Sequence, residues 1–198
     1  MKIEKRTYNN AKRAEGASNS KSQIMAAVGK LWTTHSLTDI TLDLVAKEAG
    51  VTTRTIMRKF GSKEKLFEES LAHDAASTSS DRNQATVGDI DSILNTLLAN
   101  YEAMGDAALR TIYLEPEMEI ARMIGEEGRK QHREWCANMF APFLPDQNNP
   151  QYEILLTAFI ASTEIYLWKL LRKDMNKSKE ETAEVFRRML NGLVKNSP

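Results

Sequence analysis

Apolar residues recur at helical spacing along most of this chain. The first stripe occupies positions i, i+3, i+4, i+7 and i+8, with Ile24, Ala27, Val28, Leu31 and Trp32. It predicts a helix over residues 20–35. Beyond Gly88 the same periodicity continues and no strand signal competes with it. The pattern therefore predicts an all-α protein.

Three short helices are expected directly after the first, because each is bounded by residues that favour helix ends. A hydroxyl side chain stands at each expected N-cap, namely Thr41, Thr52 and Ser62. Gly50 can end the first of these helices in a left-handed conformation. The predicted helices cover residues 41–49 and 52–60, and a further one begins at Lys63 and buries Leu66, Phe67 and Leu71.

A Ser-, Thr-, Asn- and Gly-bearing stretch near residues 75–88 indicates a domain boundary. We expect a flexible basic arm at 1–19, a first domain at 20–73, a linker region at 74–88 and a helical second domain at 89–198. The helices predicted in the second domain are Ile90–Met104, Ala107–Tyr113, Met118–Phe140, Tyr152–Lys173 and Lys179–Lys195. Ser178 and Glu181 form a capping box before the last of them.

Composition excludes several classes of protein. The chain has 198 residues, 27 basic and 27 acidic side chains and 41% hydrophobic residues, which argues against disorder and against a disulfide scaffold. The lone Cys136 cannot form an intramolecular disulfide. Apolar runs are too short to cross a bilayer and no signal peptide is evident, so we expect a cytoplasmic protein without membrane contact.

Charge is distributed unevenly along the chain. Residues 1–63 carry 12 basic and five acidic side chains, a net of +7, so the remaining 135 residues carry 15 and 22, a net of −7. A polyanion is attracted to the first part and repelled by the second. If nucleic acid is a partner, it contacts the N-terminal end.

Two short helices joined around Gly50 have the length and inward apolar positions of a helix-turn-helix. Its second helix would enter a major groove about 12 Å wide. The motif over residues 24–66 resembles the N-terminal domain of the tetracycline-repressor (TetR) family of bacterial transcriptional regulators. The residues that carry the resemblance are Ile24, Ala27, Leu31, Thr41, Val45, Ala46, Ala49, Gly50, Val51, Thr52, Thr55, Ile56, Phe60, Ser62, Lys63 and Leu66.

The resemblance implies a helix-turn-helix domain that binds double-stranded DNA. It places residues 53–55 at base-contacting positions, Thr41 and Lys63 on the phosphate backbone, and Lys59 on a base or a phosphate. Thr52 caps a helix N-terminus, which also attracts phosphate. The expected DNA-contacting residues are Thr41, Thr52, Thr53, Arg54, Thr55, Met57, Arg58, Lys59 and Lys63.

The chain departs from the family pattern at two positions of this helix. Position 57 is commonly a Tyr that contacts the DNA backbone, but Met57 offers no hydroxyl and could instead pack on sugar or a thymine methyl group. Position 54 is often Gly, whereas Arg54 can donate two hydrogen bonds to guanine O6 and N7. Arg54 is therefore our candidate for base specificity. The alternative is that the charged residues here are only a solvated helix face.

For the second domain, the resemblance implies ligand binding and homodimerisation through the last two helices. Small residues at 158, 161 and 162 would allow close helix approach, and apolar residues in these helices exceed what one small domain needs (Phe159, Ile165, Leu167, Trp168, Leu171 and the stripe Val185–Leu193). The candidate pocket residues are Leu98, Tyr101, Met104, Tyr113, Met123, Trp135 and Met139. Each could equally be core.

Other chemistry finds little support in the sequence. His132 and Cys136 stand four residues apart near Glu126 and Glu127, but two ligands are too few for a metal site, so we predict no metal and no cofactor. No phosphate-binding glycine loop, nucleophile elbow or paired-carboxylate site is found, which argues against an enzyme.

The sequence thus favours a dimeric repressor that a small apolar or amphipathic ligand releases from a palindromic operator. Whether the protein represses or activates transcription stays open. The alternatives are a TetR-like protein whose second domain binds a protein partner and, in another class, an all-helical enzyme or structural bundle.

Overall fold

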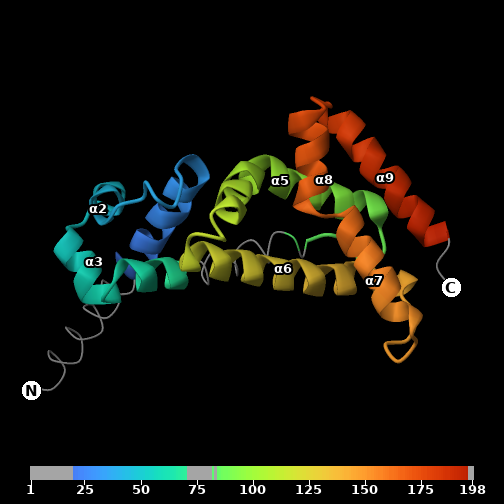
Figure 1. Cartoon of the computed structure of the whole chain (residues 1–198), viewed down its shortest axis with the longest axis horizontal. Helices are drawn as coiled ribbons and strands as arrows, with labels where there is room; N and C mark the ends of the chain where they lie inside the picture. The colour runs from blue at the N-terminus through green and yellow to red at the C-terminus, as the bar shows by residue number, and fades with distance from the viewer. Residues whose placement is uncertain (1–19, 71–81, 83, 196–198) are drawn as a thin grey trace, which may run out of the picture. The chain divides into compact units, whose positions relative to one another are not determined.

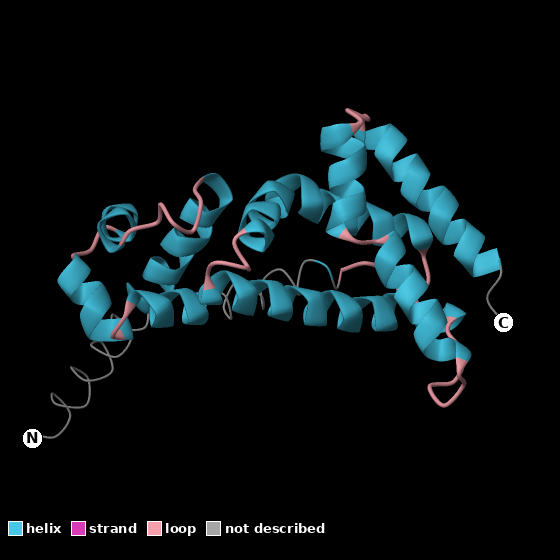
Figure 2. Ribbon diagram, in the orientation of Figure 1, coloured by secondary structure: helices cyan, strands magenta, loops and turns pink. Residues whose placement is uncertain are grey.

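The computed structural model describes residues 20–70, 82 and 84–195. The chain divides into two compact units, Met1–Asp74 and Ala75–Pro198. Figures 1 and 2 show that the regular elements drawn for the described residues are helices, which confirms the predicted all-α class. The expected arm at 1–19 lies outside the described residues, as do residues 74–81 and 83 of the expected linker.

The first unit contains four described helices: residues 20–34, α2 (Leu42–Ala49), α3 (Thr53–Phe60) and residues 63–70. Their inward residues are buried as the periodicity predicted, with Ile24, Leu31, Val45, Ile56, Phe60, Leu66 and Phe67 all at most 5% exposed. Leu71, which we expected to be buried in the last of these helices, lies outside the described residues.

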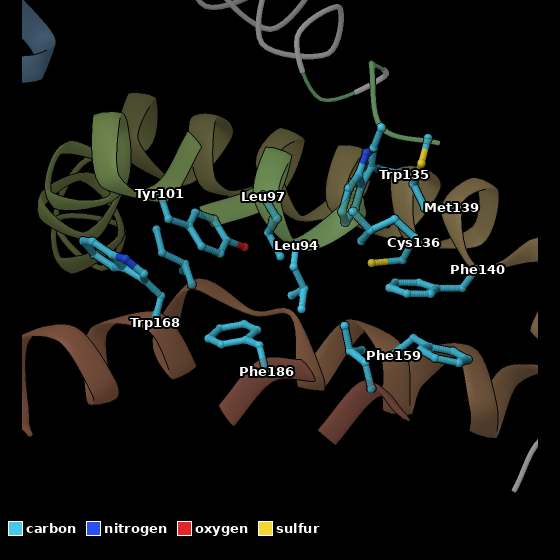
Figure 3. Packing of buried hydrophobic residues seen from close by; sticks show 14 of the residues in the cluster. Leu94, Leu97, Tyr101, Trp135, Cys136, Met139, Phe140, Phe159, Trp168 and Phe186 are labelled. Atoms are coloured by element: carbon cyan, nitrogen blue, oxygen red, sulfur yellow. The ribbon is translucent and has the colours of Figure 1, made fainter. Parts of the chain in front are cut away.

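The second unit is built from α5 (Ile90–Tyr113), α6 (Glu119–Met139), a short 3-10 turn (Ala141–Phe143), α7 (Gln151–Ser162), α8 (Ile165–Lys169), a π-helical turn (Leu170–Asp174) and α9 (Lys179–Lys195). Helix α5 packs against α6, α8 and α9, while α7 packs against α6 and α9. Aromatic side chains from several of these helices meet in one core, where the rings of Phe140 and Phe159 stack at 4.3 Å (Figure 3).

Helix α5 corrects the prediction of two helices, Ile90–Met104 and Ala107–Tyr113. It runs unbroken through Gly105, which stands where we expected the first helix to have ended. A methyl group on Gly105 would lie 2.6 Å from Cζ3 of Trp168, so the missing side chain makes room for the indole ring. The glycine therefore serves packing and does not end the helix.

The predicted helix Tyr152–Lys173 is also corrected, because it is interrupted between α7 and α8. Thr163 has φ −122° and ψ 8°, and Glu164 is extended with ψ 148°. The carboxylate of Glu164 then accepts the backbone N–H of Ile165 at 3.1 Å and caps α8.

Length and composition alone would let residues Gln151–Asp174 span a membrane, which is weak evidence, since core helices of soluble proteins pass the same test.

Capping signals in the sequence were accurate. The backbone N–H of Leu44 donates to Thr41 Oγ1 at 3.2 Å, and that of Lys65 donates to Ser62 Oγ at 3.1 Å. The capping box is also present, because Ser178 Oγ accepts the N–H of Glu181 at 3.1 Å and the Glu181 carboxylate accepts the N–H of Ser178 at 2.9 Å.

Candidate nucleic-acid interface

The turn between α2 and α3 is fixed by backbone conformation. Gly50 ends α2 with φ 66° and ψ 32°, a left-handed conformation that costs glycine little. The N–H of Val51 donates to the carbonyl of Ala46 at 2.9 Å, which closes the end of α2. Thr52 then caps α3, since its Oγ1 accepts the N–H of Thr55 at 3.2 Å. These local interactions set the short connection that orients α3.

Helix α3 separates a buried face from a polar one. Ile56 and Phe60 are 0% and 5% exposed and anchor the helix to the domain core. On the opposite side Arg54, Met57 and Arg58 are exposed, at the spacing that places them along one ridge. We call these three residues the outer ridge of α3. Thr53, Thr55 and Lys59 flank it and are half-buried.

The outer ridge is positively charged and its cations are available to a partner. Among the residues that the structure describes, neither Arg54 nor Arg58 forms an ion pair, and the first turn of α3 contains no acidic residue. Three glutamates of this unit are instead paired with lysines away from α3: Glu48 with Lys30, Glu68 with Lys65 and Glu69 with Lys21.

Lys63 stands just beyond the C-terminal end of α3. Its Nζ lies 5.5 Å from the centre of the Phe67 ring, a cation–π distance. The helix it begins and α3 both have a hydroxyl cap, but only α3 lacks an acidic residue in its first turn, because Glu64 follows Lys63. The N-terminus of α3 therefore favours a phosphate group, and at the next helix the cation of Lys63 does so.

A convex cationic helix next to a glycine turn is the geometry of a DNA-recognition unit. Comparison with known proteins decides which kind of DNA-recognition unit this is. The model of the bacterial regulatory proteins of the tetR family matches residues 24–70, which cover most of the first described helix and all of the next three. Residues 24–70 belong to the tetR family of DNA-binding domains. This matched segment includes α2 and α3, which form its DNA-binding helix-turn-helix.

Solved structures agree on the fold over most of the chain. A transcriptional regulator from Rhodococcus sp. Rha1 superposes with a TM-score of 0.69 and 14% identity, covering 89% of this chain and 97% of that one. A putative transcriptional regulator from Pseudomonas aeruginosa PAO1 gives 0.65 and 12%, covering 88% and 90%. A TetR transcription regulator from Haloarcula marismortui ATCC 43049 gives 0.57 and 16%, covering 91% and 98%. No curated protein matches the sequence.

All nine predicted DNA-contacting residues lie within the described part of the first unit. Thr41 and Thr52 occupy the N-caps of α2 and α3, residues 53–59 lie on α3, and Lys63 begins the next helix. Their individual contacts with DNA remain predictions. Met57 is 42% exposed, so its side chain is not part of the domain core.

The seven candidate pocket residues are separated by the structure. Tyr101, Trp135 and Met139 belong to the core of the second unit, and Leu98 packs against it. Met104 is half-buried, while Tyr113 and Met123 are 62% and 40% exposed. The structure brings together Leu98 and Tyr101 of α5 with Trp135 and Met139 of α6. Their role in binding a ligand stays a prediction.

A polar cluster within this core was not foreseen. Arg82 donates from Nη2 to Nδ1 of His132 at 2.8 Å, and Nε2 of His132 lies 3.1 Å from Oγ1 of Thr163. The Thr163 hydroxyl donates to the carbonyl of Phe159 at 2.7 Å. Because a guanidinium only donates and a carbonyl only accepts, the imidazole must carry its proton on Nε2. We call Arg82, His132 and Thr163 the relay.

Other groups surround the relay. The guanidinium of Arg82 lies 4.4 Å from the Trp135 ring centre, and the indole Nε1 donates to the Arg82 carbonyl at 3.1 Å. Tyr101 donates its hydroxyl to the carbonyl of Thr163 at 2.7 Å. Sγ of Cys136 lies 3.4 Å from Oγ1 of Thr163. The relay thus joins residue 82, helix α6 and the break after α7.

Burial dominates the titration of these groups. It lowers the pKa of His132 to about 3, with the charge of Arg82 acting in the same direction, so the imidazole is neutral. It raises the pKa of the Cys136 thiol to about 11 and raises that of the Tyr101 hydroxyl. Burial also raises the pKa of Glu164.

The sequence held only part of the signal for this cluster. His132 shares a helix face with Trp135, Cys136 and Met139, and a His on an apolar face indicates a buried polar interaction. Its partners are 50 residues earlier and 31 residues later in the chain, so spacing along α6 could not identify them. Among the described residues no group of three or more potential metal ligands gathers.

Proposed function

We propose that this TetR-family regulator is a cytoplasmic dimeric repressor that binds a palindromic operator and is released by a small apolar or amphipathic ligand. The observation that carries the proposal is the outer ridge of α3, where two arginines that form no ion pair with any described residue stand on a helix anchored by Ile56 and Phe60. A rigid helix with exposed cations is suited to the major groove.

Arg54 is the residue to which we assign base specificity. It lies in the first turn of α3, and N-terminal residues of a recognition helix contact base edges. Its planar guanidinium can donate to both O6 and N7 of a guanine, a pairing worth about 1–3 kcal/mol of discrimination. Lys63 is suited to a phosphate, because its single ammonium carries charge without a bidentate pattern.

The test is selection of bound fragments from random duplex DNA, followed by binding measurements over a range of salt concentrations. A symmetric consensus is expected. Arg54→Ala should lose preference at one base pair per half-site, whereas Lys63→Ala should weaken all sequences alike and lower the salt slope by about one. Lys130→Ala, on an exposed turn of α6, is the control. Equal operator affinity for wild type and Arg54→Ala would refute the role of Arg54.

We assign the dimer contact to α7 and α9, with a revised set of residues. Four residues whose apolar surface we expected to be surplus are instead buried within the domain: Phe159, Ile165, Trp168 and Leu171. Ser162, which we expected to allow close helix approach, is also buried. The exposed side of α7 has Ile154, Ala158 and Ala161 at i, i+4 and i+7, and α9 adds Met189. Ile154 is 62% exposed.

A twofold axis would bring two copies of this surface together as a four-helix interface. Ala161→Arg should therefore yield monomers in sedimentation experiments and weaken binding to the full palindrome. Glu127→Arg on α6 is the control, because that position is exposed and outside the surface. A variant Ala161→Arg that stays dimeric would place the contact elsewhere.

The effector is assigned to the second unit, near Tyr101, Trp135 and the relay. This region combines aromatic side chains with a few oriented polar groups, which is the usual composition of a ligand site. A ligand that prefers the released state by about 1–3 kcal/mol weakens operator affinity some 5- to 150-fold. Compounds that raise the melting temperature and release operator DNA would support the assignment. Hits that raise the melting temperature but leave DNA bound would contradict it.

A further inference from the structure

Met57 is the one member of the outer ridge that the proposed function leaves without a role. It is 42% exposed, although α3 is anchored by other residues and gains nothing from an apolar side chain on this side. Its neighbour on the ridge is Arg54, three residues earlier, and Arg54 in turn neighbours Arg58, four residues later. An apolar group thus lies beside the cations, on the surface that the proposed function places against DNA.

The chemistry of the side chain restricts what Met57 can contact. A thioether carries no charge and no hydrogen-bond donor, so it cannot bind a phosphate as a lysine, arginine or hydroxyl does. Its favourable interactions come from burial of apolar surface against another apolar group. In the major groove the apolar group on the base edges is the C5-methyl of thymine.

The end of α3 leaves the Met57 side chain uncovered. Gly61 follows it by one helical turn and is exposed, and a methyl group built on Gly61 would meet nothing within 4 Å. Gly61 has φ 83°, a conformation that glycine adopts readily and that ends the helix here. No side chain of residue 61 therefore shields the Met57 thioether from a base edge.

We propose that Met57 recognises the C5-methyl group of a thymine, one or two base pairs from the pair that Arg54 contacts. The offset follows from geometry, because three residues advance about 4.5 Å along a helix and base pairs are spaced by about 3.4 Å. The inference rests on the proposed function, since it requires α3 to occupy the major groove. It adds a second specificity element, which selects by shape and not by hydrogen bonding.

The experiment removes one methyl group at a time from the DNA. Each thymine of the selected operator is replaced by uracil at symmetric positions, and affinity is measured by fluorescence anisotropy. For the wild type, one position per half-site should lose about fourfold in affinity, the effect of burying one methyl group. The other thymines should show no change.

Variants of Met57 connect that methyl group to the side chain. Met57→Gln keeps the length of the side chain but replaces the thioether by an amide, so uracil and thymine should bind equally at the sensitive position. Met57→Leu keeps an apolar surface and should retain the preference for thymine. Met175→Gln, which alters a methionine that is 53% exposed in the second unit, is the matched control and should behave as wild type.

Three results would overturn the inference while leaving DNA binding intact. They are a wild type indifferent to every uracil replacement, a uracil effect that persists unchanged in Met57→Gln, and a Met57→Gln variant that weakens all sequences equally. The last would indicate packing on sugar. If the protein binds no selected duplex at all, the proposed function itself fails, and this outcome is distinct from the other three.

Discussion

Replacing Gly105 by alanine tests the packing of the second unit most directly. In the middle of a helix, alanine is favoured over glycine by about 1 kcal/mol, so the substitution would normally stabilise the protein. Here the added methyl group would stand 2.6 Å from Cζ3 and 2.7 Å from Cη2 of Trp168. Trp168 is 1% exposed and donates from Nε1 to Glu102 at 2.9 Å, so the ring cannot move aside without losing this bond.

Overpacking of this kind costs about 1–3 kcal/mol. We therefore expect Gly105→Ala to lower the free energy of unfolding of the second unit by up to about 2 kcal/mol, after the helix preference of alanine is subtracted. Gly128→Ala is the matched control, because Gly128 lies in α6 and a methyl group there meets nothing within 4 Å. That variant should gain about 0.5–1 kcal/mol.

Urea denaturation followed by tryptophan fluorescence measures both variants. Two of the three tryptophans, Trp135 and Trp168, lie in the second unit and report on its core. Since the helix preference is the same for both substitutions, the difference between the variants isolates the contact with Trp168. An equal gain in stability for Gly105→Ala and Gly128→Ala would show that the indole ring yields freely and would refute this account.

Three further predictions concern charged and buried groups. Hydrogen bonds from Arg172 and, to a lesser extent, from Trp168 lower the pKa of Glu102 to about 2, against an ordinary value of 4.5. The stabilisation that these bonds provide is present above pH 4.5 and should disappear as the pH falls towards 2. Urea titrations of wild type and Glu102→Gln over this pH range would measure it. Arg82→Met leaves Nδ1 of His132 without its donor, so it should cost about 1–3 kcal/mol of stability in thermal unfolding and raise the pKa of His132 observed by NMR. Cys136 is 0% exposed with a raised pKa, so a thiol reagent at pH 8 should modify it only after unfolding, and rapid modification of the native protein would contradict its burial.

The sequence predicted correctly those features that depend on interactions between residues close together in the chain. The caps at Thr41, Thr52 and Ser62 and the end of α2 at Gly50 were correct, because each depends on residues within one or two turns. The cationic side of α3 was also predictable, since two buried residues at i and i+4 fix which side faces outward.

The errors arose where distant contacts decide. Gly105 resembles a helix stop, yet it lies inside α5, where its missing side chain makes room for Trp168, 63 residues later. The break at Thr163 has no proline or glycine to mark it, and it is held by Tyr101 and His132 from other helices. The second unit's polar cluster was missed for the same reason, because its members come from three separate segments.

The hydrogen bonds of the relay all run in one direction, from the Arg82 guanidinium, which can only donate, to the Phe159 carbonyl, which can only accept. No member can therefore exchange roles with its neighbour, and loss of either end leaves an interior polar atom unmatched. The three residues form a cooperative unit whose contributions are not additive. A double substitution at positions 82 and 163 should cost less than the sum of the two single substitutions.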